Sequence, residues 1–145
     1  MTDTSPLAGR VRAFLARPGQ FATLATVDPD GAPRQAVIWY RLEPDGPLTI
    51  NSADGRLWPA NLRRDSRCGL VVADPADPYV FVALTGTAVE VIDDQAVAQA
   101  DIADLARRYH PDEPSIVAKD VARFRSQHRV TFRIVVAGIH DHLDG

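Results

Sequence analysis

The chain has 145 residues, of which 46% are hydrophobic and 24% are charged, values typical of one globular domain spanning residues 1–145. Its formal net charge of −3 argues against a general nucleic-acid-binding protein, which would need a basic face. A single cysteine, Cys68, excludes an internal disulfide and a cysteine-rich metal site. No apolar run approaches the ~20 residues of a membrane span, and no signal peptide is visible. We therefore expect a cytoplasmic protein that does not enter the membrane.

The first half of the chain predicts a helix followed by an antiparallel meander. Ser5-Pro6 is a typical helix start, because serine caps a helix and proline fits its first position. Two turns of the type Asp-Pro-Asp-Gly and Glu-Pro-Asp-Gly then join strands, since proline presets φ and glycine accepts positive φ. Alternating apolar residues place the first strand at 21–27, and the segments after the two turns place the next strands at 33–42 and 48–51.

The second half predicts three more strands and three helices. A short helix begins at Pro59, a longer one is capped by Asp93-Asp94, and a third segment covers 116–125. Gly86 lies inside a strand pattern, which indicates a β-bulge or a close backbone approach. The strands are placed at 69–74, 79–92 and 129–139. Six mostly antiparallel strands with a few peripheral helices predict a small barrel.

The segment 51–68 between two of these strands is the strongest candidate for a binding site. With Pro59 at the first helical position, residues 52–57 form a loop that leads into a helix N-terminus, which favours an anion. Arg56 adds a guanidinium whose donors match phosphate oxygens. The alternative is an ordinary basic helix facing solvent, with Arg63 and Arg64 exposed. Spacing alone does not decide between the two.

Other clusters of reactive side chains are explained without a site. His140 and His142 share a face of the last strand, but the sequence offers no third metal ligand, and we predict no metal site. Cys68 precedes an apolar strand, as a small core residue does. The region from Arg123 to Arg129 would suit a polyanionic coenzyme tail, although a solvated helix face is the preferred interpretation. No constellation of catalytic residues is predicted.

Four motifs follow one another in an order that resembles a known family. They are Phe21-Ala22-Thr23-Leu24-Ala25-Thr26, then Asp30-Gly31-Ala32-Pro33, then Arg56 with Asn61-Leu62-Arg63-Arg64-Asp65, and last Leu84-Thr85-Gly86-Thr87-Ala88. This order is similar to the pyridoxamine 5′-phosphate oxidase-like split β-barrels that bind FMN, and more narrowly to their branch that uses the deazaflavin coenzyme F420. The resemblance runs from about residue 21 to residue 139.

The resemblance implies a six-stranded split barrel that forms a homodimer, with two cofactor sites at the interface. It also implies which residues hold the cofactor: the phosphate at the corner after the third strand, the ring over the second strand, and Tyr79 covering the ring, from the other subunit in one arrangement. The implied cofactor-binding residues are Arg34, Val37, Ser52, Arg56, Leu57, Trp58, Asn61 and Tyr79. Trp58 stands where family members often have a phosphate-binding lysine, and it either contacts the cofactor or fills the dimer interface.

The function implied by the resemblance is an oxidoreductase. Reduced coenzyme F420 would transfer hydride to a small conjugated acceptor such as a quinone or a tetrapyrrole, with the cofactor rather than a protein side chain carrying the chemistry. Two alternatives remain open. One is an FMN-binding flavoprotein of the same family, and the other is a dimer that binds a cofactor without turnover.

Overall fold

The computed structural model describes residues 7–145, in which one antiparallel sheet of seven strands is accompanied by four helices. The strand order across the sheet is β2-β1-β5-β6-β7-β4-β3. The strands are β1 (Ala22–Val27), β2 (Pro33–Ile38), β3 (Arg41–Leu42), β4 (Leu48–Ala53), β5 (Arg67–Asp74), β6 (Asp77–Ile92) and β7 (Arg129–His142). The helices are α1 (Gly9–Leu15), α2 (Leu57–Arg64), α3 (Gln95–Tyr109) and α4 (Pro114–Arg125).

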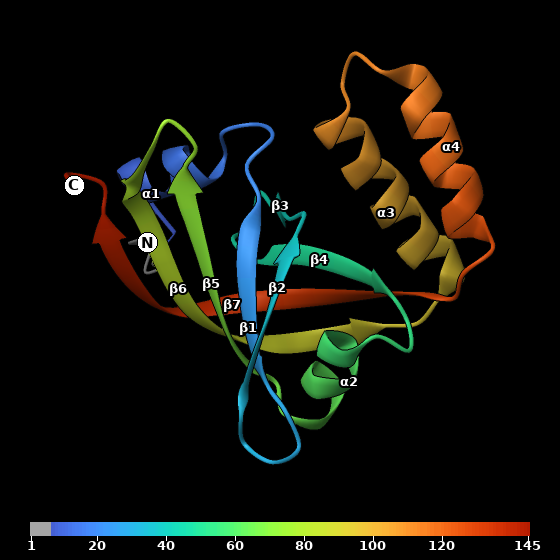
Figure 1. Ribbon diagram of the computed structural model, residues 1–145, viewed down its shortest axis with the longest axis horizontal. Helices are drawn as coiled ribbons and strands as arrows, with labels where there is room; N and C mark the ends of the chain where they lie inside the picture. Colours follow the sequence, from blue (N-terminus) through green and yellow to red (C-terminus); the bar gives the residue numbers. More distant parts are fainter. Residues whose placement is uncertain (1–6) are drawn as a thin grey trace.

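The sheet curls so that its two edges approach each other, as a split barrel requires (Figure 1). The edge strands β2 and β3 are separated in the chain by only Trp39 and Tyr40, although they pair with β1 and β4 respectively. A connection of two residues can join opposite edges of a sheet only when the sheet closes on itself. The mainly β, antiparallel barrel predicted from the sequence is therefore confirmed.

The prediction of six strands is wrong by one, because 33–42 is two strands. At Tyr40 the backbone N–H donates to the hydroxyl of Tyr109 at 3.2 Å, so it does not continue the pairing with β1. The Tyr40 hydroxyl in turn donates to the carbonyl of Leu15 at 2.6 Å. These two bonds hold the crossing point between the sheet edges, and they come from residues distant in the sequence.

The barrel core is built from the inward face of each strand. Along β1 the side chains alternate between buried and half-buried, and Leu24 is fully buried. Every residue of β4 is buried, because α3 packs against β4 and β7 on their outer face. The hairpin of α3 and α4 has a smaller core of its own, made by Ile102, Leu105, Ala106 and Phe124. It stands beside the barrel at the end where β7 begins (Figure 1).

The helix starts agree with the sequence in part. Asp94 caps α3 as predicted, and its carboxylate accepts from the N–H of Ala96 at 2.8 Å. The helix α2 begins at Leu57, two residues before the predicted start, which places Pro59 in its first turn. Proline is tolerated there because the first four N–H groups of a helix have no partner within it. The start predicted at Ser5-Pro6 lies outside the described residues.

Gly86 marks both a bulge and a close approach, as its position inside a strand predicted. The pairing of β6 with β7 shifts register between Thr85 and Gly86. A Cβ at Gly86 would lie 2.8 Å from Ile134 Cγ2 and 2.8 Å from the carbonyl oxygen of Val135. The chain therefore needs glycine here for space.

None of the helices within residues 7–145 is long and apolar enough to cross a membrane.

Candidate functional site

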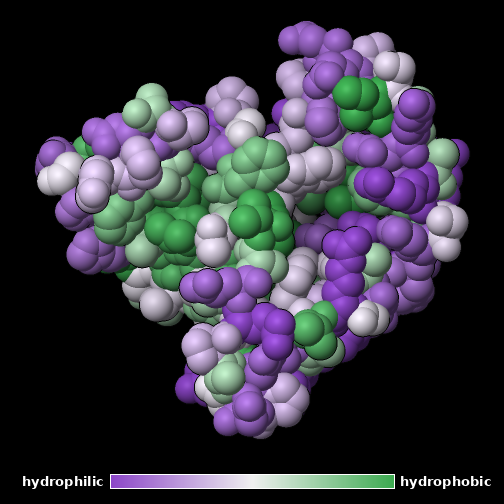
Figure 2. Space-filling view, in the orientation of Figure 1, coloured by the Kyte–Doolittle hydropathy of each residue, from purple (hydrophilic) through white to green (hydrophobic). Residues whose placement is uncertain are grey.

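A cavity of about 220 Å³ lies between the barrel and the hairpin of α3 and α4. Figure 2 shows the hollow at this place, with hydrophobic side chains at its floor and hydrophilic ones around it. The barrel contributes residues from β2, β4 and β7, and the hairpin contributes Ile102, Arg123 and Phe124. Elements that are far apart in the sequence therefore form its walls.

One wall of the cavity is apolar and aromatic. Phe21 and Val37 are 54% and 70% exposed, so this wall continues into an open surface. Trp39 stands beside them and stacks on Tyr109, with ring centroids 5.1 Å apart and an angle of 12° between the planes. This geometry offers flat apolar surface of the kind on which a conjugated ring binds.

The opposite side of the cavity is cationic. Arg56 lies at the N-cap of α2, Arg123 on the last turn of α4, and Arg129 at the start of β7. The guanidinium of Arg56 makes no hydrogen bond or ion pair with any other residue of 7–145, while Arg123 lies 3.4 Å from Asp120. Within residues 7–145, no carboxylate lines the cavity. Three guanidinium groups around one space with no acidic residue favour an anionic ligand.

Arg129 is the most unusual of the three, because it is only 4% exposed and has no carboxylate partner among residues 7–145. Its Nε donates to Asn51 Oδ1 at 3.0 Å and its Nη1 to Gln127 Oε1 at 2.7 Å. Burial, and then the charges of Arg56 and Arg123, lower the pKa of Arg129 to about 10. A charged group is rarely buried without an ion pair. The site therefore holds an uncompensated positive charge.

The sequence preference for a solvated helix face around Arg123–Arg129 is wrong for Arg129, which is buried, while Arg123 is exposed on α4 as expected and also borders the cavity. The alternation of β7 places Val130 and Phe132 in the barrel, and Arg129 and Thr131 on the opposite face. That face is buried because α3 covers it. The signal available in the sequence was the polar pair Arg129 and Thr131 on one face, but its burial depends on where α3 packs.

Four of the predicted site residues line this cavity: Val37, Ser52, Arg56 and Trp58. Ser52 is 1% exposed, and its hydroxyl donates to the carbonyl of Ala53 at 2.8 Å. Trp58 is 7% exposed and belongs to the barrel core of its own chain. Asn51, Arg123 and Arg129 line the cavity without having been selected as site residues from the sequence.

The other four predicted residues lie outside the cavity. Arg34 pairs with Asp28 at 2.8 Å, and buried Asn61 donates to Thr26 Oγ1 at 3.1 Å and to the same carboxylate at 2.8 Å, which ties α2 to the β1–β2 hairpin. Two more are exposed at 59% and 77%: Leu57 and Tyr79. A cofactor role for these four stays a prediction.

The basic residues of α2, Arg63 and Arg64, make local polar contacts and do not line the cavity. Arg63 donates to Asp93 at 2.6 Å and to Asp54 at 3.3 Å. Arg64 donates to the carbonyl of Val27 and to Asn61. These side chains lie at the surface, where the sequence interpretation placed Arg63 and Arg64, and they stabilise the corner by local contacts.

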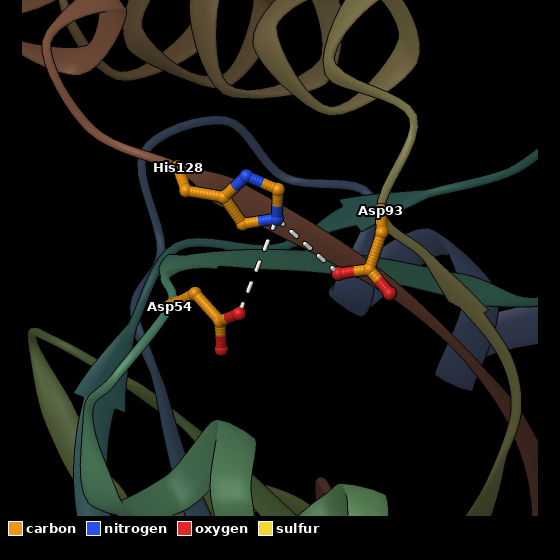
Figure 3. Close-up of side chains that lie close together, drawn as sticks. All are labelled: Asp54, Asp93 and His128. Atoms are coloured by element: carbon orange, nitrogen blue, oxygen red, sulfur yellow. Dashed lines mark ion pairs between the residues drawn. The ribbon is translucent and has the colours of Figure 1, made fainter.

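Three side chains beside this corner have metal-ligand chemistry. Asp54, Asp93 and His128 gather at the surface, with His128 Nε2 3.5 Å from Asp93 and 4.0 Å from Asp54 (Figure 3). The guanidinium of Arg63 forms ion pairs with both carboxylates, so their negative charge is already partly neutralised by a side chain. We interpret the cluster as an ion-pair network. His140 and His142 stack 5.8 Å apart beside Phe81, and no third ligand joins them within residues 7–145.

The model of the family described as pyridoxamine 5′-phosphate oxidase matches residues 7–139. The chain belongs to the pyridoxamine 5′-phosphate oxidase family. No curated protein matches it significantly. Solved structures that share the fold of this family include an F420 reductase, with 22% identity and a TM-score of 0.73 over 92% of this chain and 98% of that one.

Two further structures have the same fold. A conserved hypothetical protein from Mycobacterium tuberculosis has 21% identity and a TM-score of 0.69 over 98% of this chain and 90% of that one. HupZ from Group A Streptococcus has 20% identity and a TM-score of 0.59 over 87% of both chains. At these identities the similarity establishes the fold of the pyridoxamine 5′-phosphate oxidase family.

Proposed function

We propose that this protein is an oxidoreductase that binds a phosphorylated flavin-type cofactor in the cavity, with coenzyme F420 preferred and FMN as the alternative. The observation that carries the proposal is the convergence of Arg56, Arg123 and Arg129 on a cavity that no carboxylate of the described residues lines, next to an aromatic wall. This set of donors suits phosphate oxygens, and the wall suits a flat ring. The solved F420 reductase with the same fold supports the preference for the deazaflavin.

The protein side chains position the cofactor. Arg56 at the N-cap of α2 combines its charge with the free N–H groups of the first helical turn, and both favour the phosphate. The ring would lie along β2 near Val37 and Trp39, which exclude water from one side. The bound cofactor supplies the hydride transfer. The proposed acceptor is a small conjugated molecule such as a quinone or a tetrapyrrole, for which the exposed apolar wall offers a surface.

We also propose that the protein is a homodimer in which the partner completes the site. A cavity of about 220 Å³ is smaller than the roughly 300–1,000 Å³ of common ligand sites. The outward faces of β1, β5 and β6 carry small and apolar residues together with threonine: Ala25 lies opposite Gly69, and Val71 lies between Thr23 and Ala83. Hydrophobic side chains gather over these strands in Figure 2. Such a patch is typical of an interface, and Tyr79 of a second copy would then be available to cover the ring.

The alternative is a dimer that binds the cofactor without turnover. Among the described residues, those that line the cavity include no histidine, cysteine or carboxylate that could act as an acid or base. A cofactor that carries the chemistry does not need such a group, so this observation is compatible with both functions.

Titration of the apoprotein with F420 and with FMN, followed by fluorescence quenching, tests the proposal. We expect saturable binding of F420, weaker binding of FMN, and oxidation of reduced F420 when a quinone is added. Binding of F420 without turnover of any acceptor would favour the non-catalytic dimer. Failure of both cofactors to bind would contradict the proposed function.

A further inference from the structure

We propose that Asn51 is a positioning residue that holds Arg129 in place without neutralising its charge, so that Arg129 can bind a dianionic oxyanion such as a phosphate group. The inference deepens the proposed function, because it concerns the same cavity. It assigns the deepest cationic contact of that cavity to Arg129, with Arg56 at the more exposed position.

The orientation of the Asn51 amide is determined by its hydrogen bonds. Its Nδ2 donates to Thr131 Oγ1 at 3.0 Å and to the carbonyl of Ala98 at 2.9 Å. With both N–H groups used in this way, Oδ1 faces Arg129 and accepts from Nε at 3.0 Å. A flipped amide would turn its NH₂ group toward the guanidinium and its oxygen toward a carbonyl, which is unfavourable. Asn51 therefore offers Arg129 an acceptor in one fixed direction.

The buried carboxylate of Asp101 forms no ion pair with Arg129. The hydroxyl of Thr131 donates to Asp101 Oδ2 at 2.9 Å, and the other oxygen of Asp101 accepts from Arg41 at 3.0 Å. The charge of Asp101 is thus paired with Arg41, while neutral Thr131 and Asn51 stand between Asp101 and Arg129. An aspartate at position 51 would have almost the same size as asparagine and would form the ion pair that this arrangement avoids.

Arg129 keeps donors for a ligand. Its two hydrogen-bond acceptors, Asn51 and Gln127, are neutral, and its Nη2 makes no hydrogen bond within residues 7–145. The guanidinium also lies 4.7 Å from the ring centroid of Phe124, which limits its movement. A guanidinium has five N–H donors in a rigid plane, and Arg129 lines the cavity together with two other arginines. An oxyanion there would satisfy these donors and offset the mutual repulsion of the three cations.

The test is thermal unfolding of the full chain with increasing inorganic phosphate at constant ionic strength, with chloride as the reference anion. We expect phosphate to raise the Tm of the wild type. In Asn51→Asp the introduced carboxylate should pair with Arg129 and weaken the phosphate effect at least tenfold in apparent affinity. Gln127→Glu puts a carboxylate on the other acceptor of Arg129 without disturbing the bonds of Asn51, and it should act in the same direction. Arg125→Gln, on the exposed side of α4, is the matched control that keeps the wild-type response.

A double-mutant comparison of Asn51 and Arg129 gives the second readout, which is again the affinity for phosphate. In an Arg129→Gln background, Asn51→Asp should not weaken phosphate binding further, because its target is missing. A wild type that phosphate does not stabilise would overturn the inference. An unchanged phosphate response in both Asn51→Asp and Gln127→Glu would overturn it as well. Phosphate stabilisation that depends on Arg129, combined with no binding of F420 or FMN, would leave this inference standing and contradict the proposed function.

Discussion

The indole of Trp58 packs against the ring of Phe132 inside the barrel, with centroids 5.7 Å apart and an angle of 51° between the planes. Trp58 is 7% exposed, and Phe132 is fully buried. Part of the indole also borders the cavity. Its main role is therefore in the core of its own chain, which differs from the interface role considered from the sequence. Trp58 thus joins the barrel core to the wall of the cavity.

Replacing Trp58 is expected to lower the free energy of unfolding. Large-to-small changes at buried aromatic positions cost about 3–5 kcal/mol, so Trp58→Ala should lose an amount of this order. Trp58→Lys should also destabilise the protein without a gain in cofactor affinity, because the ammonium would be buried. The adjacent Leu57→Lys is the control, since Leu57 is 59% exposed. Urea unfolding measures all three, and a stable Trp58→Lys that binds phosphorylated cofactor more tightly would contradict this assignment.

Gly86→Ala is expected to destabilise the sheet by about 1–3 kcal/mol, the usual cost of overpacking a dense core. The added methyl would lie 2.8 Å from the backbone oxygen of Val135, which cannot move without disturbing the strand pairing. Gly69→Ala on the neighbouring strand is the matched control, because its nearest contact would be an ordinary 3.5 Å to the carbonyl of Leu84. Chemical denaturation of both variants compares them, and equal stability losses would show that the close approach at Gly86 is not the cause.

Cys68 is expected to react slowly with iodoacetamide in the folded protein. Burial raises the pKa of its thiol from 9.0 to about 11, so at pH 8 the folded protein holds about 100-fold less thiolate than the unfolded chain. The raised pKa also means that the thiol of the folded state keeps its proton to a higher pH than the thiol of the unfolded chain does. Stability from this group is present below pH 9 and is lost as the pH rises toward 11. Alkylation followed by mass spectrometry, with urea-unfolded protein as the reference, checks the rate. Equal rates in the two states at pH 8 would refute the burial of the thiol.

Light scattering is expected to give about twice the chain mass of 15.8 kDa. Val71 lies on the outward face of β5, between buried Leu70 and Val72, in the apolar area over β1, β5 and β6. Val71→Glu should therefore shift the protein toward monomer, because a charge would be buried at the interface. Val97→Glu on α3 adds the same charge outside this area and should leave the mass unchanged. A wild type that is monomeric at micromolar concentration would exclude the proposed dimer.

Local chemistry made part of the fold predictable. Gly31 and Gly46 have φ of +88° and +116°, as the turn sequences required, and Asp94 caps α3. The break at Trp39-Tyr40 was not predictable from 33–42, because the apolar run over 36–40 continues through it. That break depends on the hydroxyl of Tyr109, which lies 69 residues away from Tyr40.

The candidate site, like the fold, was predictable from local sequence only in part. Arg56 was found from the sequence because a loop, a proline and a helix start lie within a few residues of one another. Arg129 was not found, because it is buried only where α3 packs on β7. The acceptor of its Nε is the neutral amide of Asn51, which comes from a distant strand and not from a local motif. Local motifs identified one cation of the site, and only the assembled barrel and hairpin brought the other two beside it.

The central claim is that the arginine-lined cavity binds the phosphate of a flavin-type cofactor, and Arg56→Ala tests it most directly. The dissociation constants to be measured are those of the wild type and the variant for FMN and for riboflavin, its counterpart without phosphate. Loss of a charge-assisted contact costs about 1.5–3 kcal/mol, so binding of FMN should weaken roughly 10- to 150-fold while binding of riboflavin changes little. Equal losses for both ligands, or no loss for either, would contradict the claim that Arg56 and this cavity hold the phosphate.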